Sequence, residues 1–441
     1  MHPYIPNTDE VLNKMLEEIG ISDFKELISY IPEEFQLKRD LNLPKPHSEY
    51  QLEKEIAELV LQSKDVKQLS CFAGCGSYDH IVPAVIPFLL SRSEFYTAYT
   101  PYQAEVSQGT LQFYFEFQSL ICDLTKMEVA NASMYDGASA TAEAVLMADR
   151  LKPGKNILIS NTLNPFIKRV INTYNYGLNL HLVSIPEVDG TIDIDFLRKQ
   201  DFSNVSAIVV QSPNYYGIIE DVIEIRNIIP EDVLFILNSD PISLALLKKP
   251  GDIGVDIYVG DGQSLGNGLY FGGPTCGIFA SKMKYIRQLP GRIAGITKDT
   301  EGKIGFVTTL QTREQHIRRA KATSNICTSQ ALNALATTIF LSITGKEGLY
   351  EIAYQSLQKS HYLADKIKDI SGFSLVYDKP FFLEFLMRIP INNRDFLKKA
   401  LEKNILAGVV PENREKELLV AVTEKRTKEE LDQYIDFLKS F

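Results

Sequence analysis

Polar and small residues near position 136 have the spacing of an anion-binding site. Residues 136–141 read Asp-Gly-Ala-Ser-Ala-Thr and lead into an alanine-rich stretch that runs to residue 149. Small residues at the start of a helix leave backbone N–H groups accessible, and the helix dipole favours an anion there. A phosphate is therefore predicted at this point, with the hydroxyl of Ser139 or Thr141 as a donor. The alternative is an ordinary N-cap on a packed helix.

Two further polar residues follow short apolar runs that are expected to be strands. Asn214 lies in the segment Ser-Pro-Asn-Tyr-Tyr-Gly at 212–217, after the run at 207–210, and Asp240 follows the run at 233–237. An aspartate at such a place can pair with the protonated ring nitrogen of a pyridoxal cofactor, which deepens the electron sink of that cofactor. Both residues are also common in turns, so a structural role is the alternative for each.

Position 263 is informative because it does not hold a lysine. In the type I pyridoxal-phosphate fold, the Schiff-base lysine follows the ring-pairing aspartate by roughly twenty to thirty residues, near another strand. Here the run at 257–259 is followed by Gly-Asp-Gly-Gln-Ser-Leu-Gly, and Gln263 occupies the place expected for the lysine. An amide cannot form a Schiff base with an aldehyde. The nearest lysines flank the two strands at unsuitable places, and they are Lys248, Lys249, Lys282 and Lys284.

Short apolar runs alternate with helical segments across the middle of the chain. The expected strands are residues 157–159, 207–210, 233–237, 257–259 and 277–280. Continuous apolar runs suit strands that are buried on both faces, and intervening helices imply mostly parallel pairing. A doubly wound α/β sheet is therefore predicted, in which ligands bind at the carboxyl ends of the strands.

The pattern divides the chain into three predicted domains. Residues 1–65 form an N-terminal helical arm, residues 66–327 a large α/β cofactor-type domain, and residues 328–441 a smaller C-terminal α+β domain. The arm is expected to bury one helical stripe, made of Leu12, Met15, Leu16 and Ile19. Residues 94–96 are expected to be strand-like.

Two helix signals stand out near the C-terminus. The helical patterns at 330–344 and 348–370 separate around Gly345. The last helix begins with a capping box of Thr427 and Glu430. Its spacing predicts four buried residues, which are Leu431, Tyr434, Ile435 and Leu438.

Composition and charge exclude several classes of protein. The formal net charge is −10, whereas binding to nucleic acid or to an anionic membrane requires clustered excess cation. Cys71 and Cys75 lack the second Cys or His pair of a zinc site, so buried free thiols and no metal are expected. There is no signal-peptide pattern, and the longest apolar run, at 81–90, is far shorter than the roughly 20 residues of a membrane span. A soluble, cytoplasmic protein is predicted.

Longer strings of the sequence resemble the α-type subunits (subunit 1) of the glycine decarboxylase P-proteins, the pyridoxal enzymes of the glycine cleavage system. The strings are FAGCGSYDH at 72–80, YTPYQAEVSQG at 99–109, NASMYDGA at 131–138, GQSLG at 262–266, FGGP at 271–274, QTREQHIRR at 311–319 and ATSNIC at 322–327. They span most of the chain in the expected order. Ala104 and Lys126 depart from many relatives, which have proline and glycine there, and neither position has a predicted role.

The resemblance implies a type I pyridoxal-phosphate-dependent transferase fold, similar to that of aspartate aminotransferase, and a function shared with a second chain. P-proteins occur as one long polypeptide or split in two, and this chain matches the first half. The implied enzyme is a glycine dehydrogenase (aminomethyl-transferring, decarboxylating), an oxidoreductase that passes the aminomethyl group of glycine to the lipoyl arm of the H-protein. P-protein subunit 2 is expected to hold the pyridoxal phosphate covalently, in a heterotetramer with two copies of each subunit. The isolated chain is expected to be inactive.

The expected site residues fall into two groups. Candidate contributors to the shared catalytic site are Tyr96, Tyr99, Tyr102 and His80. Packing at a subunit interface, where tyrosine is enriched, is the alternative for the tyrosines. The relic of a cofactor pocket, in what would be a degenerate active site, is expected to comprise Ser139, Thr141, Asn214, Asp240 and Gln263. The alternative functions are a stand-alone aminotransferase or desulfurase, and a non-catalytic scaffold subunit.

Overall fold

The structure is a computed structural model, which describes residue 4 and residues 6–441. The chain forms two units, Met1–Ser63 and Lys64–Phe441. The first unit contains three α-helices among its described residues, which are α1 (Asp9–Ile19), α2 (Phe24–Leu27) and α3 (Glu49–Leu61).

The predicted buried stripe in this first unit is wrong. Leu16 is buried, but Leu12, Met15 and Ile19 are 40%, 47% and 57% exposed. The periodicity correctly indicates a helix, but a buried face also requires a second layer to pack against it. No second layer within this short unit covers the described residues of α1 beyond Leu16.

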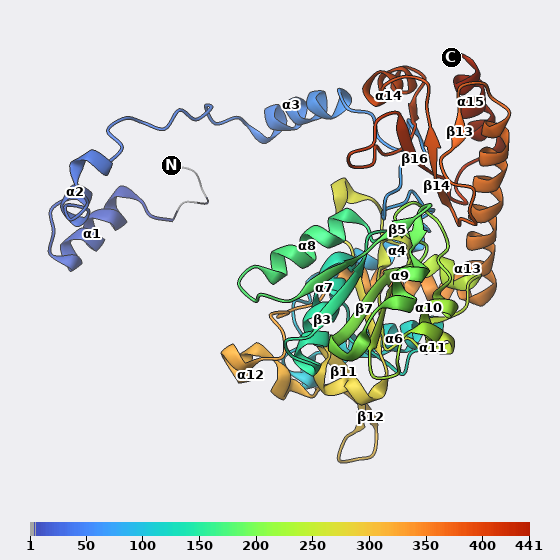
Figure 1. Ribbon diagram of the computed structural model, residues 1–441. Coiled ribbons are helices and arrows are strands. Elements are labelled where there is room, and N and C mark those ends of the chain that lie inside the picture. Colours follow the sequence, from blue (N-terminus) through green and yellow to red (C-terminus); the bar gives the residue numbers. More distant parts are fainter. Residues whose placement is uncertain (1–3, 5) are drawn as a thin grey trace. The chain divides into compact units, whose positions relative to one another are not determined.

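A seven-stranded sheet lies at the centre of the second unit (Figure 1). In spatial order its strands are β2 (Val129–Ala130), β10 (Gly277–Ser281), β9 (Ile257–Asp261), β8 (Leu234–Asn238), β7 (Val205–Gln211), β3 (Asn156–Ser160) and β4 (Leu182–Ile185). The strands from β9 to β4 are parallel, whereas β10 is antiparallel to both of its neighbours. The predicted mostly parallel α/β sheet is confirmed, and each of the five predicted strands corresponds to an observed one.

Helices cover both faces of this sheet (Figure 1). Among them are α7 (Gly137–Leu151), α8 (Pro165–Asn175), α9 (Ile194–Lys199) and α10 (Val222–Ile228). In β3, Ile157 packs in a cluster with Val145 of α7. Its neighbour Leu158 points to the other face and packs in a cluster with Ile225 of α10. Burial on both faces explains why the strands read as continuous apolar runs.

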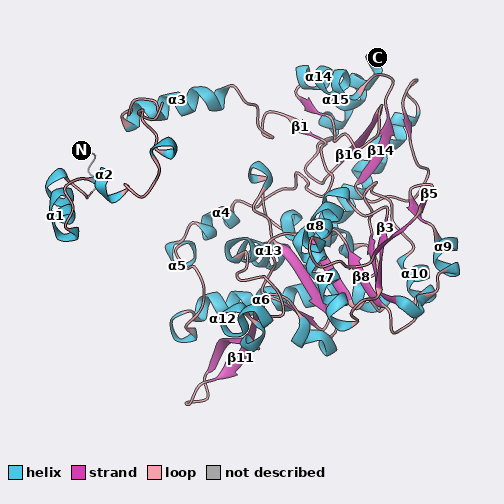
Figure 2. Cartoon of the chain, turned by 60° about the vertical axis from the view of Figure 1, so that its left-hand side comes forward, coloured by secondary structure: helices cyan, strands magenta, loops and turns pink. Residues whose placement is uncertain are grey.

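The remaining elements surround the sheet or form smaller sheets. The further helices are α4 (Val85–Leu90), α5 (Ser93–Tyr96), α6 (Gln108–Thr125), α11 (Pro250–Ile253), α12 (Gln315–Arg318), α13 (Ala331–Lys368), α14 (Asn393–Glu402) and α15 (Lys428–Lys439). The further strands are β1 (Ser70–Cys71), β5 (Glu187–Val188), β6 (Thr191–Ile192), β11 (Ile293–Lys298), β12 (Ile304–Thr309), β13 (Ser374–Leu375), β14 (Glu384–Arg388), β15 (Ile405–Leu406) and β16 (Glu417–Ala421). The hairpin of β11 and β12 projects from the body of this unit in both views (Figure 2).

Residues 94–96 are helical rather than strand-like, because they belong to α5. The backbone N–H of Thr97 donates to the carbonyl of Ser93 at 3.1 Å, which closes one helical turn. Three residues are too few for strand periodicity to outweigh such local hydrogen bonds.

The helix signals near the C-terminus are confirmed. Gly345 interrupts α13 with a φ of 57° and a ψ of −164°, where the two helical patterns were expected to separate. The hydroxyl oxygen of Thr427 accepts a hydrogen bond from Glu430 N, and the Glu430 side chain completes the capping box at the start of α15. The four predicted residues of α15 are buried in a cluster with β14 and β16, which pair antiparallel.

None of the described helices is both long and apolar enough to cross a lipid bilayer.

Candidate functional site

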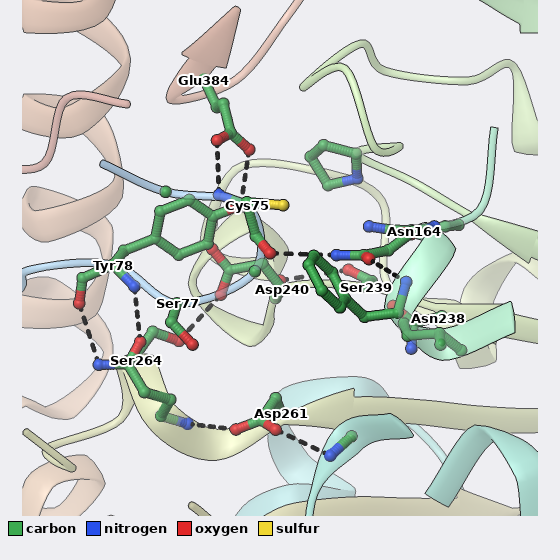
Figure 3. A pocket seen from close by; sticks show the side chains of 18 of the residues that line it. Cys75, Ser77, Tyr78, Asn164, Asn238, Ser239, Asp240, Asp261, Ser264 and Glu384 are labelled. Carbon is green, nitrogen blue, oxygen red and sulfur yellow. Dashed lines mark hydrogen bonds between the residues drawn. The ribbon is translucent and has the colours of Figure 1, made fainter. Parts of the chain in front are cut away.

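A pocket of about 600 Å³ lies at the carboxyl ends of three neighbouring strands. Gln211, Asn238 and Asp261 end β7, β8 and β9 and line it. Gly137, at the start of α7, lines another side, and Glu384 of β14 lines the side contributed by the C-terminal part of the chain (Figure 3). This position agrees with the expectation that ligands of a doubly wound sheet bind at the carboxyl ends of its strands.

The side chain of Gln263 is fixed inside this pocket and is only 3% exposed. Its Nε2 donates to the carbonyl oxygens of Tyr78 and Asn267, both at 3.0 Å. Its Oε1 accepts from the backbone N–H of Tyr78 at 2.8 Å. Because both ends of the amide are hydrogen-bonded, Gln263 ties the loop at 74–78 to the segment that follows β9.

Glu384 also holds the loop at 74–78 (Figure 3). Its Oε1 accepts from the backbone N–H of Cys75 at 2.7 Å, and its Oε2 accepts from the hydroxyl of Tyr78 at 3.0 Å. A side chain at Gly74 would collide with the Glu384 carboxylate, so this close approach requires glycine. Burial raises the pKa of Glu384 to about 7.

Asp240 has one carboxylate oxygen without a partner. Oδ1 accepts from the hydroxyl of Ser264 at 2.9 Å and from the backbone N–H of Ile242 at 3.1 Å. Oδ2 is buried and has no hydrogen-bond partner among the residues that the structure describes. Burial raises the pKa of Asp240, and the nearby charge of His80 opposes that rise. A buried, unpaired acceptor of this kind suits a ligand that brings its own N–H donor.

His80 belongs to a neighbouring buried pair rather than to the lining of the pocket. Its Nδ1 lies 2.6 Å from Oε2 of Glu424, and its Nε2 is buried with no partner in the described part of the chain. Burial alone would lower the pKa of His80, but the hydrogen bond and charge of Glu424 outweigh it and raise that pKa.

The start of α7 forms the remaining end of the pocket. The Asp136 carboxylate accepts from the backbone N–H of Ser139 at 2.7 Å, and the Ser139 hydroxyl returns to the Asp136 backbone in a capping box. The Thr141 hydroxyl donates to the Gly137 carbonyl at 2.7 Å inside the helix. Both hydroxyls that were expected to serve a phosphate are thus engaged within α7. The backbone N–H of Gly137 donates instead to Oδ2 of Asp261 at 2.8 Å.

The comparison with known families decides the affiliation of the chain. The family model described as "Glycine cleavage system P-protein" matches residues 2–438. The chain belongs to the P-protein family. It is 48% identical over 439 residues to a probable glycine dehydrogenase (decarboxylating) subunit 1 from Chloroherpeton thalassium, and the match covers 99% of both chains. A protein of the same name from Carboxydothermus hydrogenoformans is also 48% identical, with 99% of both chains covered.

Solved structures agree with this affiliation. A crystal structure of glycine decarboxylase (P-protein) of the glycine cleavage system, in inhibitor-bound form, matches with a TM-score of 0.89 and 39% identity, and covers 100% of both chains. Glutamate decarboxylase of Lactobacillus brevis shares the fold with a TM-score of 0.68 at 14% identity, covering 93% of this chain and 96% of that one. This P-protein chain therefore has the type I fold of the pyridoxal-phosphate-dependent enzymes, as predicted.

Three residues of the expected relic pocket line it, and of these only Asp240 has a side-chain polar atom without a described partner. Asp240, Gln263 and Asn214 all face the pocket. The Asn214 amide donates to Gly190 O at 2.8 Å and to Glu220 Oε1 at 2.7 Å, and its oxygen accepts two backbone N–H groups. Ser139 and Thr141 are buried in α7 beside the pocket. Their functional roles stay predictions.

The three tyrosines lie on the surface in a different setting from His80. Tyr96, Tyr99 and Tyr102 are 68%, 79% and 63% exposed. The guanidinium carbon of Arg292 lies 5.3 Å from the centroid of the Tyr102 ring. The centroids of the Tyr102 and His316 rings are 6.5 Å apart, in a T-shaped arrangement. Their role in catalysis also stays a prediction.

Glu384 and Asp261 are among the site residues that were not predicted from the sequence. Glu384 lies in a strand whose apolar pattern gives no sign of a pocket. Asp261 lies within the segment that was singled out for Gln263, but its contact with Gly137 joins positions 124 residues apart. The only signal at either place was a single acidic residue in an apolar run.

Pyridoxal phosphate is the cofactor of the fold family. The residues of this P-protein pocket suit it in one respect and do not suit it in two others. The unpaired Oδ2 of Asp240 would suit a protonated ring nitrogen. However, none of the described residues that line the pocket is a lysine, and Gln263 is committed to backbone hydrogen bonds. The carboxylate of Asp261 also lies at the helix start, where a phosphate would bind. A covalently held pyridoxal phosphate therefore does not fit the described lining of this pocket.

Proposed function

We propose that this chain is subunit 1 of a two-subunit P-protein that decarboxylates glycine together with subunit 2. The observation that carries the proposal is the pocket, whose described lining contains no lysine and in which Tyr78 holds both ends of the Gln263 amide. Full-length similarity to proteins named subunit 1 supports it as well, because that name implies a second subunit.

The partner subunit holds the pyridoxal phosphate covalently in this proposal, in a heterotetramer with two copies of each chain. When bound there, the cofactor supplies an electron sink for the carbanion that remains after loss of carbon dioxide. The aminomethyl group then passes to the lipoyl arm of the H-protein. The type I fold of this chain supports the relevance of the cofactor, while its own pocket does not fit it.

This chain contributes to the shared site through an aromatic loop that contains Tyr96, Tyr99 and Tyr102. Arg292 is buried, and its Nε lies 3.4 Å from Oε2 of Glu314, which holds the guanidinium in place. This guanidinium packs over one face of the Tyr102 ring. Exposed tyrosines supported in this way suit the rim of a pocket, because their rings exclude water and their hydroxyls still offer hydrogen bonds. Packing against the partner without a catalytic role is the alternative for these residues.

Co-purification with the subunit 2 encoded in the same organism, followed by a glycine-dependent carbon dioxide exchange assay, tests the proposal. The complex should exchange labelled carbon dioxide into glycine, and this chain alone should not. Activity of the isolated chain at the rate of the complex would favour a stand-alone enzyme instead. A complex that forms but does not catalyse exchange would contradict the proposed reaction.

A further inference from the structure

The N-terminus of α7 is an anion-binding arrangement that the chain fills with its own atoms. A helix start offers unpaired N–H groups and the positive end of the dipole. Here the N–H of Ser139 donates to the Asp136 carboxylate, and the N–H of Gly137 donates to the Asp261 carboxylate. Two donors that a phosphate would need are therefore already used.

Asp261 is held in this position by three hydrogen bonds. Its Oδ2 accepts from the Gly137 N–H at 2.8 Å and from the hydroxyl of Thr275 at 3.1 Å, and its Oδ1 accepts from the backbone N–H of Gln263 at 2.9 Å. These donors come from the start of α7, from the segment just before β10, and from the segment after β9. A carboxylate with this many donors from separate elements is a fixed part of the pocket rather than a mobile side chain.

Gly137 packs closely against the backbone and Cβ of Asp261. A Cβ atom built on Gly137 would lie 2.9 Å from Cβ of Asp261 and 3.0 Å from its backbone nitrogen. The start of the helix is thus in direct contact with the end of β9. A phosphate could reach the N–H of Gly137 only by displacing the Asp261 side chain.

The charge at this end of the pocket also opposes a phosphate. Asp136 and Asp261 both line the pocket, and none of its described lining residues is a lysine, arginine or histidine. A phosphate monoester carries about −1.5 to −2 charges at pH 7. Two carboxylates without a compensating cation would repel it at short range in a partly desolvated site.

We propose that Asp261 takes the place of the phosphate at the start of α7 and makes this pocket reject phosphorylated ligands. Asp261 is thus a specificity-determining residue. This inference rests on the proposed function, in which the partner alone carries the phosphorylated cofactor, and it names the group that keeps the cofactor out of this chain. An unphosphorylated ligand with an N–H donor for Asp240 remains compatible with the pocket.

Binding of inorganic phosphate to the full-length chain, measured by calorimetry, tests the proposal. Asp261→Ser removes the carboxylate and opens space at the Gly137 N–H, so its affinity for phosphate should rise on the order of tenfold or more over that of the wild type. Asp195→Ser is the matched control, because Asp195 is 74% exposed in α9, away from the pocket, and its loss changes the net charge equally. The control should bind phosphate as weakly as the wild type.

If a variant is too unstable for calorimetry, its thermal unfolding midpoint can be measured in phosphate and in chloride of equal ionic strength. Phosphate should raise the unfolding midpoint of Asp261→Ser and leave those of the wild type and the control unchanged, because only a ligand that binds the folded state stabilises it. Phosphate binding by the wild type, no gain in the variant, or a variant that does not fold even in phosphate would each overturn the proposal. The assay uses neither partner nor glycine, so its failure is distinct from a failure of the proposed reaction.

Discussion

The amide of Gln263 and the backbone of Tyr78 form a two-way hydrogen-bonded pair, with Nε2 donating to Tyr78 O at 3.0 Å and Oε1 accepting from Tyr78 N at 2.8 Å. A lysine at this position could donate but could not accept. The same residue therefore cannot make both of these hydrogen bonds and also serve as a Schiff-base lysine.

Replacing Gln263 with lysine should destabilise the chain without restoring cofactor binding. The change leaves the buried N–H of Tyr78 without its acceptor, which costs about 1–3 kcal/mol of the free energy of unfolding. Urea unfolding measures this cost. Gln358→Lys, at an exposed position, is the matched control and should be close to neutral. An absorbance band from a pyridoxal-phosphate adduct of Gln263→Lys would contradict the exclusion of phosphate by Asp261.

The hydroxyls of Tyr99 and Tyr102 are expected to serve catalysis rather than assembly. Tyr99→Phe and Tyr102→Phe remove a hydroxyl and little volume, so the complex should elute unchanged from a sizing column. Loss of a hydrogen bond in the transition state would cost about 1–3 kcal/mol, or roughly ten- to a hundredfold in the rate of carbon dioxide exchange.

Tyr176→Phe is the control for these variants, because Tyr176 is 93% exposed at the end of α8. It should retain full activity. Unchanged carbon dioxide exchange in both loop variants, or a complex that dissociates, would indicate that Tyr99 and Tyr102 have a structural role only.

Glu384 should stabilise the folded chain by an amount that decreases as pH rises. Its pKa in the folded chain is about 7, above its ordinary value of 4.5, so the folded state binds the proton more tightly than the unfolded state. This contribution is fully present below pH 4.5 and is lost as pH rises to about 7. The difference in pKa corresponds to about 3 kcal/mol at most.

Glu384→Gln removes this pH-dependent component. The difference in free energy of unfolding between wild type and variant should therefore shift in favour of the variant between pH 4.5 and pH 7. Denaturant unfolding at several pH values measures it, with Glu347→Gln, at an exposed position, as the control. Parallel pH profiles for wild type and Glu384→Gln would show that Glu384 does not titrate in this range.

Local patterns predicted the fold well because they depend on neighbours in sequence. The apolar run at 207–210 became the buried part of β7, and Gly345 interrupted α13 where the two patterns separated. The stripe around Leu16 failed, since periodicity reports a helix but not whether a partner layer covers it.

The site could be predicted only where one residue carried the signal. Gln263 was singled out because an amide cannot replace the amine of a lysine, and it lines the pocket. Asp261 and Glu384 were missed because their roles arise from contacts with Gly137 and Cys75, which are 124 and 309 residues away in sequence. Such contacts depend on the assembled sheet and leave no local pattern.

The most direct test of the central claim is to locate the cofactor in the active complex of the two subunits. Borohydride reduction of the complex loaded with pyridoxal phosphate fixes the cofactor to its lysine, and peptide mapping then identifies the labelled chain. We expect one pyridoxyl-lysine for each pair of subunits, on the partner, and none on this chain. A stoichiometric pyridoxyl-lysine on this chain, such as at Lys248, Lys249, Lys282 or Lys284, would contradict the account.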